Sequence, residues 1–192
     1  MSNNDELEVK VDRTGWDPGP WDSEPDKLNW RTRAGLPGMI VRNRQGALCG
    51  YVAVTKGHPC FERSYSSTYE AGPDGEPDFA RPLPNPVDAL SVHGGITYGD
   101  KCQHAICHVP EPGEPDDVWW LGFDCNHAGD YAPADARWRK EAMPGKAHLF
   151  ACGSHETYRD LAYVREEVES LAAQLAACAP PEKGGSTKEE KP

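Results

Sequence analysis

The sequence lacks the patterns that assign many proteins to a functional class at first reading. No apolar run approaches the ~20 residues that a membrane-spanning helix needs. The phosphate-binding patterns Gly-x-x-x-x-Gly-Lys and Gly-x-Gly-x-x-Gly are absent, as is the Gly-x-Ser-x-Gly turn of α/β-hydrolases. The first residues, Met1–Asp5, show neither the basic nor the apolar stretch of a signal peptide. We therefore expect a cytoplasmic protein and no membrane partner.

Basic residues are also scarce. Lys and Arg number 20 against 31 Asp and Glu, which gives a formal net charge of −11. Because binding to phosphates requires clustered Lys and Arg, nucleic acid is not the default partner, and anionic membranes are disfavoured too. Two exceptions remain, since a metal could bring a polyanion to the protein or an acidic face could imitate DNA. A small-molecule ligand fits the composition better. The sequence does not indicate an oligomeric state.

The seven cysteines are an odd number, and in the expected reducing compartment we predict free thiols that mostly serve as small core residues. One group, Cys102, His104, Cys107 and His108, has the composition of a zinc site. Its members fall within seven residues, however, whereas structural zinc sites usually draw pairs from separated positions. We expect Cys107 in the core and either His104 or His108 beside the functional site.

The length of 192 residues suits one domain, and the 19 glycines and 18 prolines favour a loop-rich α+β fold over a helical bundle. We predict a small, mainly antiparallel sheet of about five strands with one C-terminal amphipathic helix. The predicted regions are an extended acidic arm (1–29), the domain (30–178) with irregular inserts (66–90 and 131–153), and a disordered tail (179–192). The expected strands lie at 39–41, 48–54, 92–98, 104–109 and around 119–123.

The helix is predicted over 157–176. Thr157 and Asp160 resemble a capping box at its start. Apolar residues then recur at steps of three and four, which gives one apolar stripe; they are Leu161, Val164, Val168, Leu171 and Leu175. We expect this stripe to pack on the sheet, although its heptad spacing would also fit a dimer seam.

The stretch from Trp119 to Asp130 organises the rest of the chain. An apolar run typical of a buried strand turns abruptly polar and places Asp124, His127 and Asp130 three residues apart. A turn at Cys125-Asn126 would let these side chains face one ligand. His58 and His93 also follow predicted strands, so we predict a shared site with His58, His93, Asp124 and His127 as metal ligands and Asp130 and His127 as catalytic groups.

Imidazole and carboxylate ligands suit a divalent metal such as Zn, Mn or Fe, and an incomplete protein shell leaves a position for activated water. The predicted binding residues near this metal are Trp120, Gly94, Gly95 and Tyr98. Each of the polar residues also has a simpler interpretation, since His and Asp after a strand often only cap turns.

Five motifs occur in an order that resembles a family of uncharacterised proteins encoded by bacteriophages and prophages. They are LCGYV (48–52), GHP (57–59), VHGGITY (92–98), WWLGFDCNHAGD (119–130) and YRDLAYV (158–164). The resemblance covers roughly residues 30–176. It implies a setting in the bacterial host cytoplasm, where host takeover or counter-defence is a reasonable role, and it supplies no activity.

Three functions are therefore open. The leading hypothesis is a metal-assisted hydrolase of a nucleotide-like or phosphorylated small molecule. The second is a non-catalytic binding module that sequesters a small ligand or a host protein, with the same polar groups as hydrogen-bond partners. The third is a structural or accessory phage protein.

Overall fold

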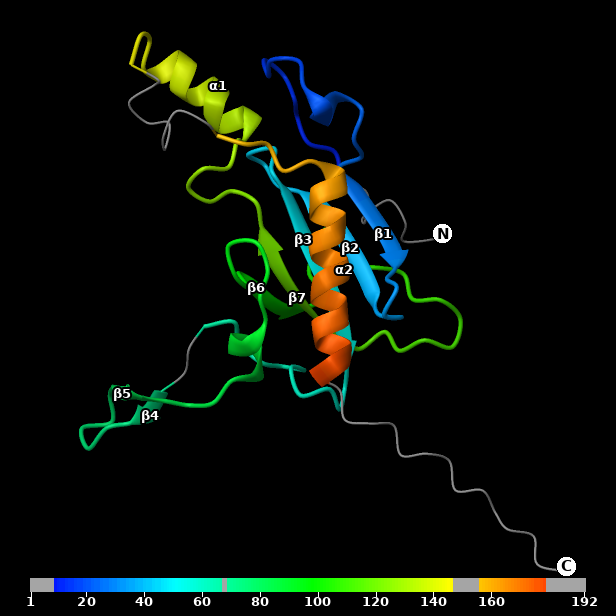
Figure 1. The fold of residues 1–192 in the computed structure, drawn as a ribbon, viewed down its shortest axis with the longest axis vertical. Helices are drawn as coiled ribbons and strands as arrows, with labels where there is room; N and C mark the ends of the chain where they lie inside the picture. Colours follow the sequence, from blue (N-terminus) through cyan, green and yellow to red (C-terminus); the bar gives the residue numbers. More distant parts are fainter. Residues whose placement is uncertain (1–8, 67–68, 147–155, 179–192) are drawn as a thin grey trace, which may run out of the picture.

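The computed structural model describes residues 9–66, 69–146 and 156–178. Its centre is a five-stranded antiparallel sheet in the order β1-β2-β3-β7-β6, with the long helix α2 across one face (Figure 1). The elements are β1 (Lys27–Arg31), β2 (Pro37–Arg42), β3 (Leu48–Thr55), β6 (Tyr98–Lys101), β7 (Val118–Asp124) and α2 (Leu161–Cys178). The predicted α+β class, with a mainly antiparallel sheet of five strands and a C-terminal helix, is confirmed.

The hairpin of β2 and β3 forms where the sequence predicts it. The side-chain oxygen of Asn43 accepts a hydrogen bond from the Ala47 N–H at 3.0 Å. Gly46 adopts a φ of +92°, a left-handed conformation that glycine takes without strain. Gly50 in β3 has a different role, because a Cβ at this position would lie 2.6 Å from the Val168 side chain of α2. Glycine here lets the helix approach the sheet closely.

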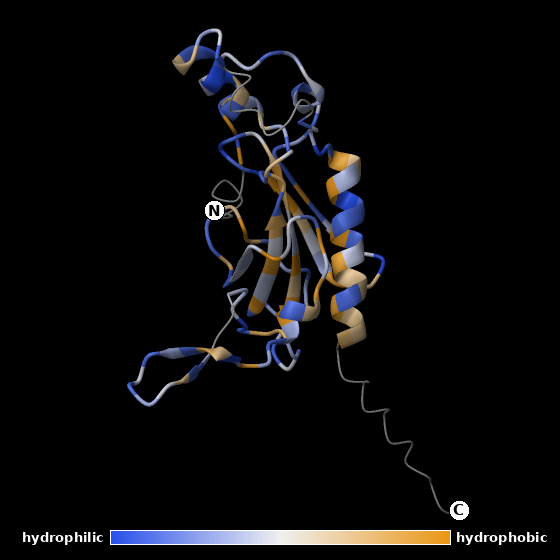
Figure 2. Ribbon diagram, turned by 60° about the vertical axis from the view of Figure 1, so that its left-hand side comes forward, coloured by the Kyte–Doolittle hydropathy of each residue, from blue (hydrophilic) through white to orange (hydrophobic). Residues whose placement is uncertain are grey.

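The centre of the sheet is buried on both faces. On one face, five fully buried residues of α2 pack against the sheet; they are Val164, Val168, Leu171, Ala172 and Leu175. The turned view in Figure 2 shows α2 standing along this side of the sheet. On the opposite face, Met39, Tyr51 and Trp120 form a second apolar layer, against which Val9 and Ile106 pack. Burial on both faces explains why β3 reads as a continuous apolar run rather than an alternating one.

Helix α2 begins at Leu161 and not at Thr157. The Asp160 side chain caps the helix by accepting a hydrogen bond from the Tyr163 N–H at 2.9 Å. Thr157 instead lies in an extended segment that pairs with the chain after β7, where its N–H donates to the Gly129 carbonyl. The capping box predicted at Thr157 is therefore wrong, whereas the predicted apolar stripe is confirmed. Among the described residues, no helix is long and apolar enough to cross a membrane.

The predicted acidic arm is partly an element of the sheet. Residues 27–29 of that arm belong to β1, and a fully buried arginine on β2 fixes the segment before them. Arg42 forms ion pairs with Glu24 at 2.9 Å and Asp26 at 2.8 Å, and its guanidinium also donates to the Tyr158 hydroxyl at 2.6 Å. These contacts tie the segment before β1 to the segment before α2. Residues 1–8 of the arm lie outside the described residues.

Two of the predicted strands are shorter or absent. The chain from Val92 to Thr97 is a turn-containing loop, and β6 begins only at Tyr98. Residues 104–109 form no strand, and Cys102 and Cys107 are joined by a disulfide. The expectation that these thiols are free is therefore wrong, and neither sulfur can be a zinc ligand in this state. The other described cysteines are free, with Cys49, Cys60 and Cys125 buried.

The two predicted inserts contain regular structure. Residues 66–90 include the hairpin of β4 (Tyr69–Ala71) and β5 (Pro77–Pro82), which projects away from the sheet (Figure 1), and a short 3-10 helix at Pro86–Ala89. The region 131–153 includes helix α1 (Pro133–Ala142), so its prediction as an irregular insert is wrong there. Residues 147–153 of that insert and the tail 179–192 lie outside the described residues.

Candidate functional site

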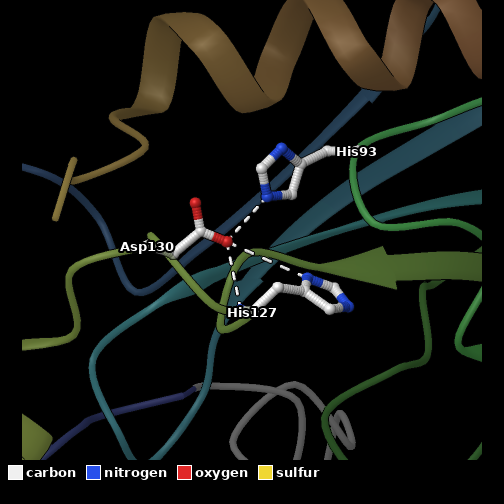
Figure 3. Close-up of side chains that lie close together, drawn as sticks. All are labelled: His93, His127 and Asp130. Carbon is white, nitrogen blue, oxygen red and sulfur yellow. Dashed lines mark hydrogen bonds and ion pairs between the residues drawn. The ribbon is translucent and has the colours of Figure 1, made fainter. Parts of the chain in front are cut away.

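Polar side chains from three segments meet beside the first turns of α2. They come from the loop before β6, from the turn after β7, and from the first turn of α2 together with Arg159 just before it. We call this group the His93 cluster; it comprises His93, His127, Asp130, Arg159 and Tyr163. Figure 3 shows His93 and His127 approaching the Asp130 carboxylate from different sides.

Asp130 is the centre of the His93 cluster, and its side chain is only 2 % exposed. Its Oδ2 lies 2.7 Å from Nε2 of His93 and accepts a hydrogen bond from the His127 backbone N–H at 3.1 Å. Its Oδ1 accepts from Nε of Arg159 at 2.9 Å. Both carboxylate oxygens are thus oriented by fixed partners.

These contacts keep Asp130 ionised. Burial by itself raises the pKa of the carboxyl, but hydrogen bonds from His93, Arg159 and the His127 N–H outweigh it and bring the pKa below its usual value. The hydrogen bond to Asp130 raises the pKa of Arg159 in turn, so the guanidinium stays charged. The buried cluster therefore contains a carboxylate beside a cation at neutral pH.

His93 is held at both ring nitrogens and at its backbone. Nδ1 lies 3.0 Å from the Tyr163 hydroxyl, while Nε2 faces Asp130. Its backbone N–H donates to Glu167 at 2.9 Å. Burial raises the pKa of Tyr163, so its hydroxyl is protonated and serves as a neutral hydrogen-bond partner. The position of the His93 ring is therefore fixed, and its two partners determine which ring nitrogen carries the proton.

His127 is held differently, because its Nδ1 is buried and has no hydrogen-bond partner among the described residues. That nitrogen lies 3.8 Å from Oδ2 of Asp130 and 3.8 Å from Oδ1 of Asp124. Asp124 is itself oriented by the Thr97 hydroxyl at 2.9 Å and by the Asn126 N–H at 3.0 Å. The turn predicted at Cys125-Asn126 thus exists and brings Asp124, His127 and Asp130 together.

The donor set of the cluster suits a metal ion. One ligand atom from each of His93, His127 and Asp130 lies within 4.8 Å of the other two. Two atoms bound to one tetrahedral zinc ion at ~2.0–2.2 Å are separated by roughly 3.3–3.6 Å. The observed separations from Asp130 Oδ2, 2.7 Å to His93 and 3.8 Å to His127, lie on either side of that range. The three residues could hold a cation once the ligand atoms of Asp130 and His93 move apart and those of Asp130 and His127 move together.

His58 does not join this site, so its predicted role as a metal ligand is wrong. Its Nδ1 accepts a hydrogen bond from the Cys60 N–H, and its Nε2 lies 2.9 Å from the carbonyl of Leu175 in α2. Leu175 lies twelve residues along α2 from Tyr163, which corresponds to about 18 Å at the helical rise. His58 therefore interacts with the far end of the helix.

The predicted binding residues divide between the two faces of the sheet. Gly94 touches the His93 cluster, since a Cβ there would lie 2.1 Å from the His127 ring, whereas a Cβ at Gly95 would meet no described atom within 4 Å. Tyr98 and Trp120 belong to the apolar layer on the face opposite to α2, and the fully buried Trp120 cannot stack on a ligand of this cluster. Their predicted place beside the metal is wrong.

The two histidines near the disulfide also lie elsewhere. His104 is exposed and has a positive φ of 49°, and the His108 ring packs against Trp120 with ring centroids 5.3 Å apart. Neither borders the His93 cluster, contrary to the prediction for this pair.

Three residues of this region carried no signal in the sequence. Arg159 lies just before α2, while Tyr163 and Glu167 are on it, one and two turns further along. The Arg159 guanidinium also stacks over the Tyr163 ring at 4.9 Å from its centroid. The spacing of four residues places these side chains on one helix face. Nothing in that spacing distinguishes them from the residues of an ordinary solvated face.

A glycine pair offers a direct check on how closely the His93 cluster is packed. Gly94→Ala should displace the His127 ring, because the added Cβ would lie 2.1 Å from Cε1 of the imidazole and the φ of +67° is unfavourable for alanine. Gly95→Ala has a similar φ of +87° and no neighbour within 4 Å. It should cost only the backbone strain, about 1–2 kcal/mol. Thermal melts and the NMR shifts of the His127 ring would compare them; equal effects and an unmoved ring would contradict this packing.

Comparisons with protein-family models, with curated proteins and with solved structures found no match. The chemistry of the His93 cluster is therefore inferred from its own atoms.

Proposed function

We propose that the His93 cluster binds a divalent metal ion, of the kind Zn, Mn or Fe, and that the protein is a metal-assisted hydrolase of a nucleotide-like or phosphorylated small molecule. The observation that carries this proposal is the buried Nδ1 of His127, which lies 3.8 Å from carboxylate oxygens of both Asp124 and Asp130 and has no hydrogen-bond partner among the described residues. A cation bound between His127 and Asp130 would satisfy the nitrogen lone pair and the Asp130 charge, with Asp124 beside it at the edge of the cluster.

The residues of the cluster have distinct roles in this proposal. His93, His127 and Asp130 would hold the ion, which would supply Lewis-acid activation of a water molecule. In the tautomer that leaves Nε2 of His93 free for an ion, Nδ1 carries the proton and would donate to the Tyr163 hydroxyl, which lies 3.0 Å away. Asp124 is placed to take a proton from the attacking water, since its side chain is 32 % exposed and faces His127.

Arg159 supports the choice of a phosphorylated substrate. Its Nε is bound to Asp130, and its Nη atoms make no hydrogen bond to the described residues, while the side chain is 30 % exposed. A guanidinium with free donors beside a metal site suits a phosphate oxygen better than a neutral group. With a net charge of −11, the protein suits a small phosphorylated molecule better than a long polyanion. The phage resemblance would place this activity in the host cytoplasm, in host takeover or counter-defence.

Metal binding is the first test. The purified protein should bind one divalent ion in calorimetric titration with Zn²⁺ or Mn²⁺, and elemental analysis after dialysis should give the same ratio. His127→Ala should weaken binding by 10-fold or more, by analogy with the ~10–100-fold effects of even outer-shell partners. His104→Asn is the matched control, because His104 is exposed, lies outside the cluster, and asparagine tolerates its positive φ. Equal affinities of the two variants would argue against a metal at this site.

Turnover is the second test. Wild-type protein is incubated with nucleoside mono-, di- and triphosphates, cyclic nucleotides and sugar phosphates, with and without the bound metal, and the products are followed by mass. Product formed only in the metal-loaded sample supports the hydrolase. Substrates recovered intact under all conditions, while the metal binds at one equivalent, would overturn it.

One observation favours a second candidate, a non-catalytic binding module. His93 and Asp130 already satisfy each other at 2.7 Å, which is shorter than the roughly 3.3–3.6 Å between two ligands of one tetrahedral zinc ion. In that case the cluster stays metal-free, and Arg159 with His127 binds an anionic ligand that is released unchanged. Ligand binding that is insensitive to chelators, without product, would identify this function.

A further inference from the structure

A separate cavity of about 690 Å³ lies away from the His93 cluster. It is bordered by most residues of β1, by parts of the segment 108–114, and by Trp120 of β7. Because Trp120 belongs to the apolar layer opposite to α2, this cavity and the His93 cluster are on different faces of the sheet. Its volume falls in the range of ~300–1,000 Å³ that is usual for small-molecule sites.

Two residues that line this cavity each have a buried ring nitrogen without a hydrogen-bond partner among the described residues. These nitrogens are Nε1 of Trp120 and Nδ1 of His108. The Trp120 side chain is 0 % exposed, and the two rings meet edge to face with their centroids 5.3 Å apart. A buried polar group without a partner is destabilising, so two such groups in contact on one cavity wall indicate a bound molecule that satisfies both.

The chemistry of the two nitrogens restricts that molecule. The Nε1 of Trp120 can only donate a hydrogen bond. Burial lowers the pKa of His108, so its ring is neutral at pH 7, and with the proton on Nε2 its Nδ1 accepts. A matching ligand therefore carries an acceptor and a donor close together, which is the pattern of a carboxamide or a lactam.

Four of the five charged side chains that border the cavity have partners, the exception among the described residues being Glu111. Arg31 is paired with Glu114, and Asp26 is paired with Arg42 and Arg13. The Lys27 ammonium donates to the Cys107 carbonyl at 2.7 Å. A ligand with a net charge would have to compete with these contacts, so an uncharged ligand is favoured.

We propose that this cavity binds a small uncharged molecule through a carboxamide or lactam edge, which accepts a hydrogen bond from Nε1 of Trp120 and donates one to Nδ1 of His108. A single water molecule, which occupies ~30 Å³ in the liquid, would fill only a small part of the space. This site is independent of the proposed metal site.

Indole N–H resonances of the ¹⁵N-labelled full-length protein provide the test. The chain has 6 tryptophans, and the spectrum of Trp120→Phe identifies the signal of Trp120. Benzamide should shift this signal saturably. Toluene, which has the same ring and no amide, loses both hydrogen bonds and should bind about 100-fold more weakly. Benzoate, which is charged and has no donor, loses one and should bind about tenfold more weakly.

The variant His108→Phe separates recognition from simple filling of an apolar space. It keeps an aromatic ring of similar size and removes Nδ1, so benzamide should bind about tenfold more weakly and toluene should be unaffected. The other indole signals report whether the variant is folded. The absence of a saturable shift with benzamide, or equal binding of benzamide and toluene to the wild type, would overturn the proposal. The cavity would then be a hydrated space without a specific ligand.

Discussion

Asp130→Asn should reduce the turnover of any hydrolysed substrate by ~10²–10⁴-fold, the range typical of a lost acid–base or metal-orienting group. In the native protein, one oxygen of Asp130 accepts from Arg159 while the other faces His93 and accepts from the His127 N–H. An asparagine side chain has only one acceptor atom. Its NH₂ group would face either the Arg159 donor or the His127 N–H, and it cannot neutralise a bound cation.

The same substitution should also destabilise the fold, because hydrogen bonds to a charged partner contribute about 1.5–3 kcal/mol. Activity must therefore be measured at a temperature at which circular dichroism shows that Asp130→Asn is folded. Asp124→Asn is the matched control, since Asp124 has a 32 % exposed side chain and lies at the edge of the cluster. Asp124→Asn should lower turnover because the proton acceptor is lost, while metal affinity should stay close to that of the wild type.

The two variants together separate the candidate functions. A hydrolase predicts loss of both metal binding and product with Asp130→Asn, and retained metal binding with Asp124→Asn. A metal-free binding module predicts that Asp130→Asn changes ligand affinity by no more than the value of one charged hydrogen bond, with no product from any form. Full turnover by folded Asp130→Asn would exclude the His93 cluster as the catalytic site.

The sequence predicted the central strands and the helix because their signals are local. The hairpin of β2 and β3 is marked by its turn residues, β7 by its aromatic run, and α2 by an apolar stripe of which four members are fully buried. The strand β1 was hidden within an acidic region. Its neighbours Glu24 and Asp26 are neutralised by Arg42, a buried arginine from the adjacent strand. That pairing exists only in the folded structure, so composition alone predicted a solvated arm.

The candidate site was predicted only in part, because the sequence marks polar residues after strands but not which of them come together. His93, His127 and Asp130 meet, and the turn that joins two of them was recognised from Asn126 and Gly129. His58 gave the same kind of signal, a histidine after a strand, and only its contact with the carbonyl of Leu175 places it at the other end of α2. Which of several polar residues after strands share a site depends on the sheet order and on the register of the helix, and no local pattern encodes either.

Leu171→Asp should unfold or aggregate the protein. Leu171 is 0 % exposed and lies on the face of α2 that packs on the sheet. Shortening such a leucine to alanine costs ~2–5 kcal/mol, and a carboxylate there adds the cost of an unpaired buried charge. The sum is comparable to the ~5–15 kcal/mol by which domains of this kind are stable.

The matched control for this change is Ala173→Asp, two residues further along the same helix at an exposed position. Both variants introduce the same residue with similar helix propensity and a similar distance from the helix end, so their difference isolates burial. Ala173→Asp should melt within a few degrees of the wild type, as expected for surface changes of about 0.5 kcal/mol or less. Thermal melts followed by circular dichroism and size-exclusion chromatography would compare them. A soluble Leu171→Asp with an unshifted melting temperature would mean that α2 does not pack on the sheet, and the position of Arg159, Tyr163 and Glu167 around His93 would then have no support.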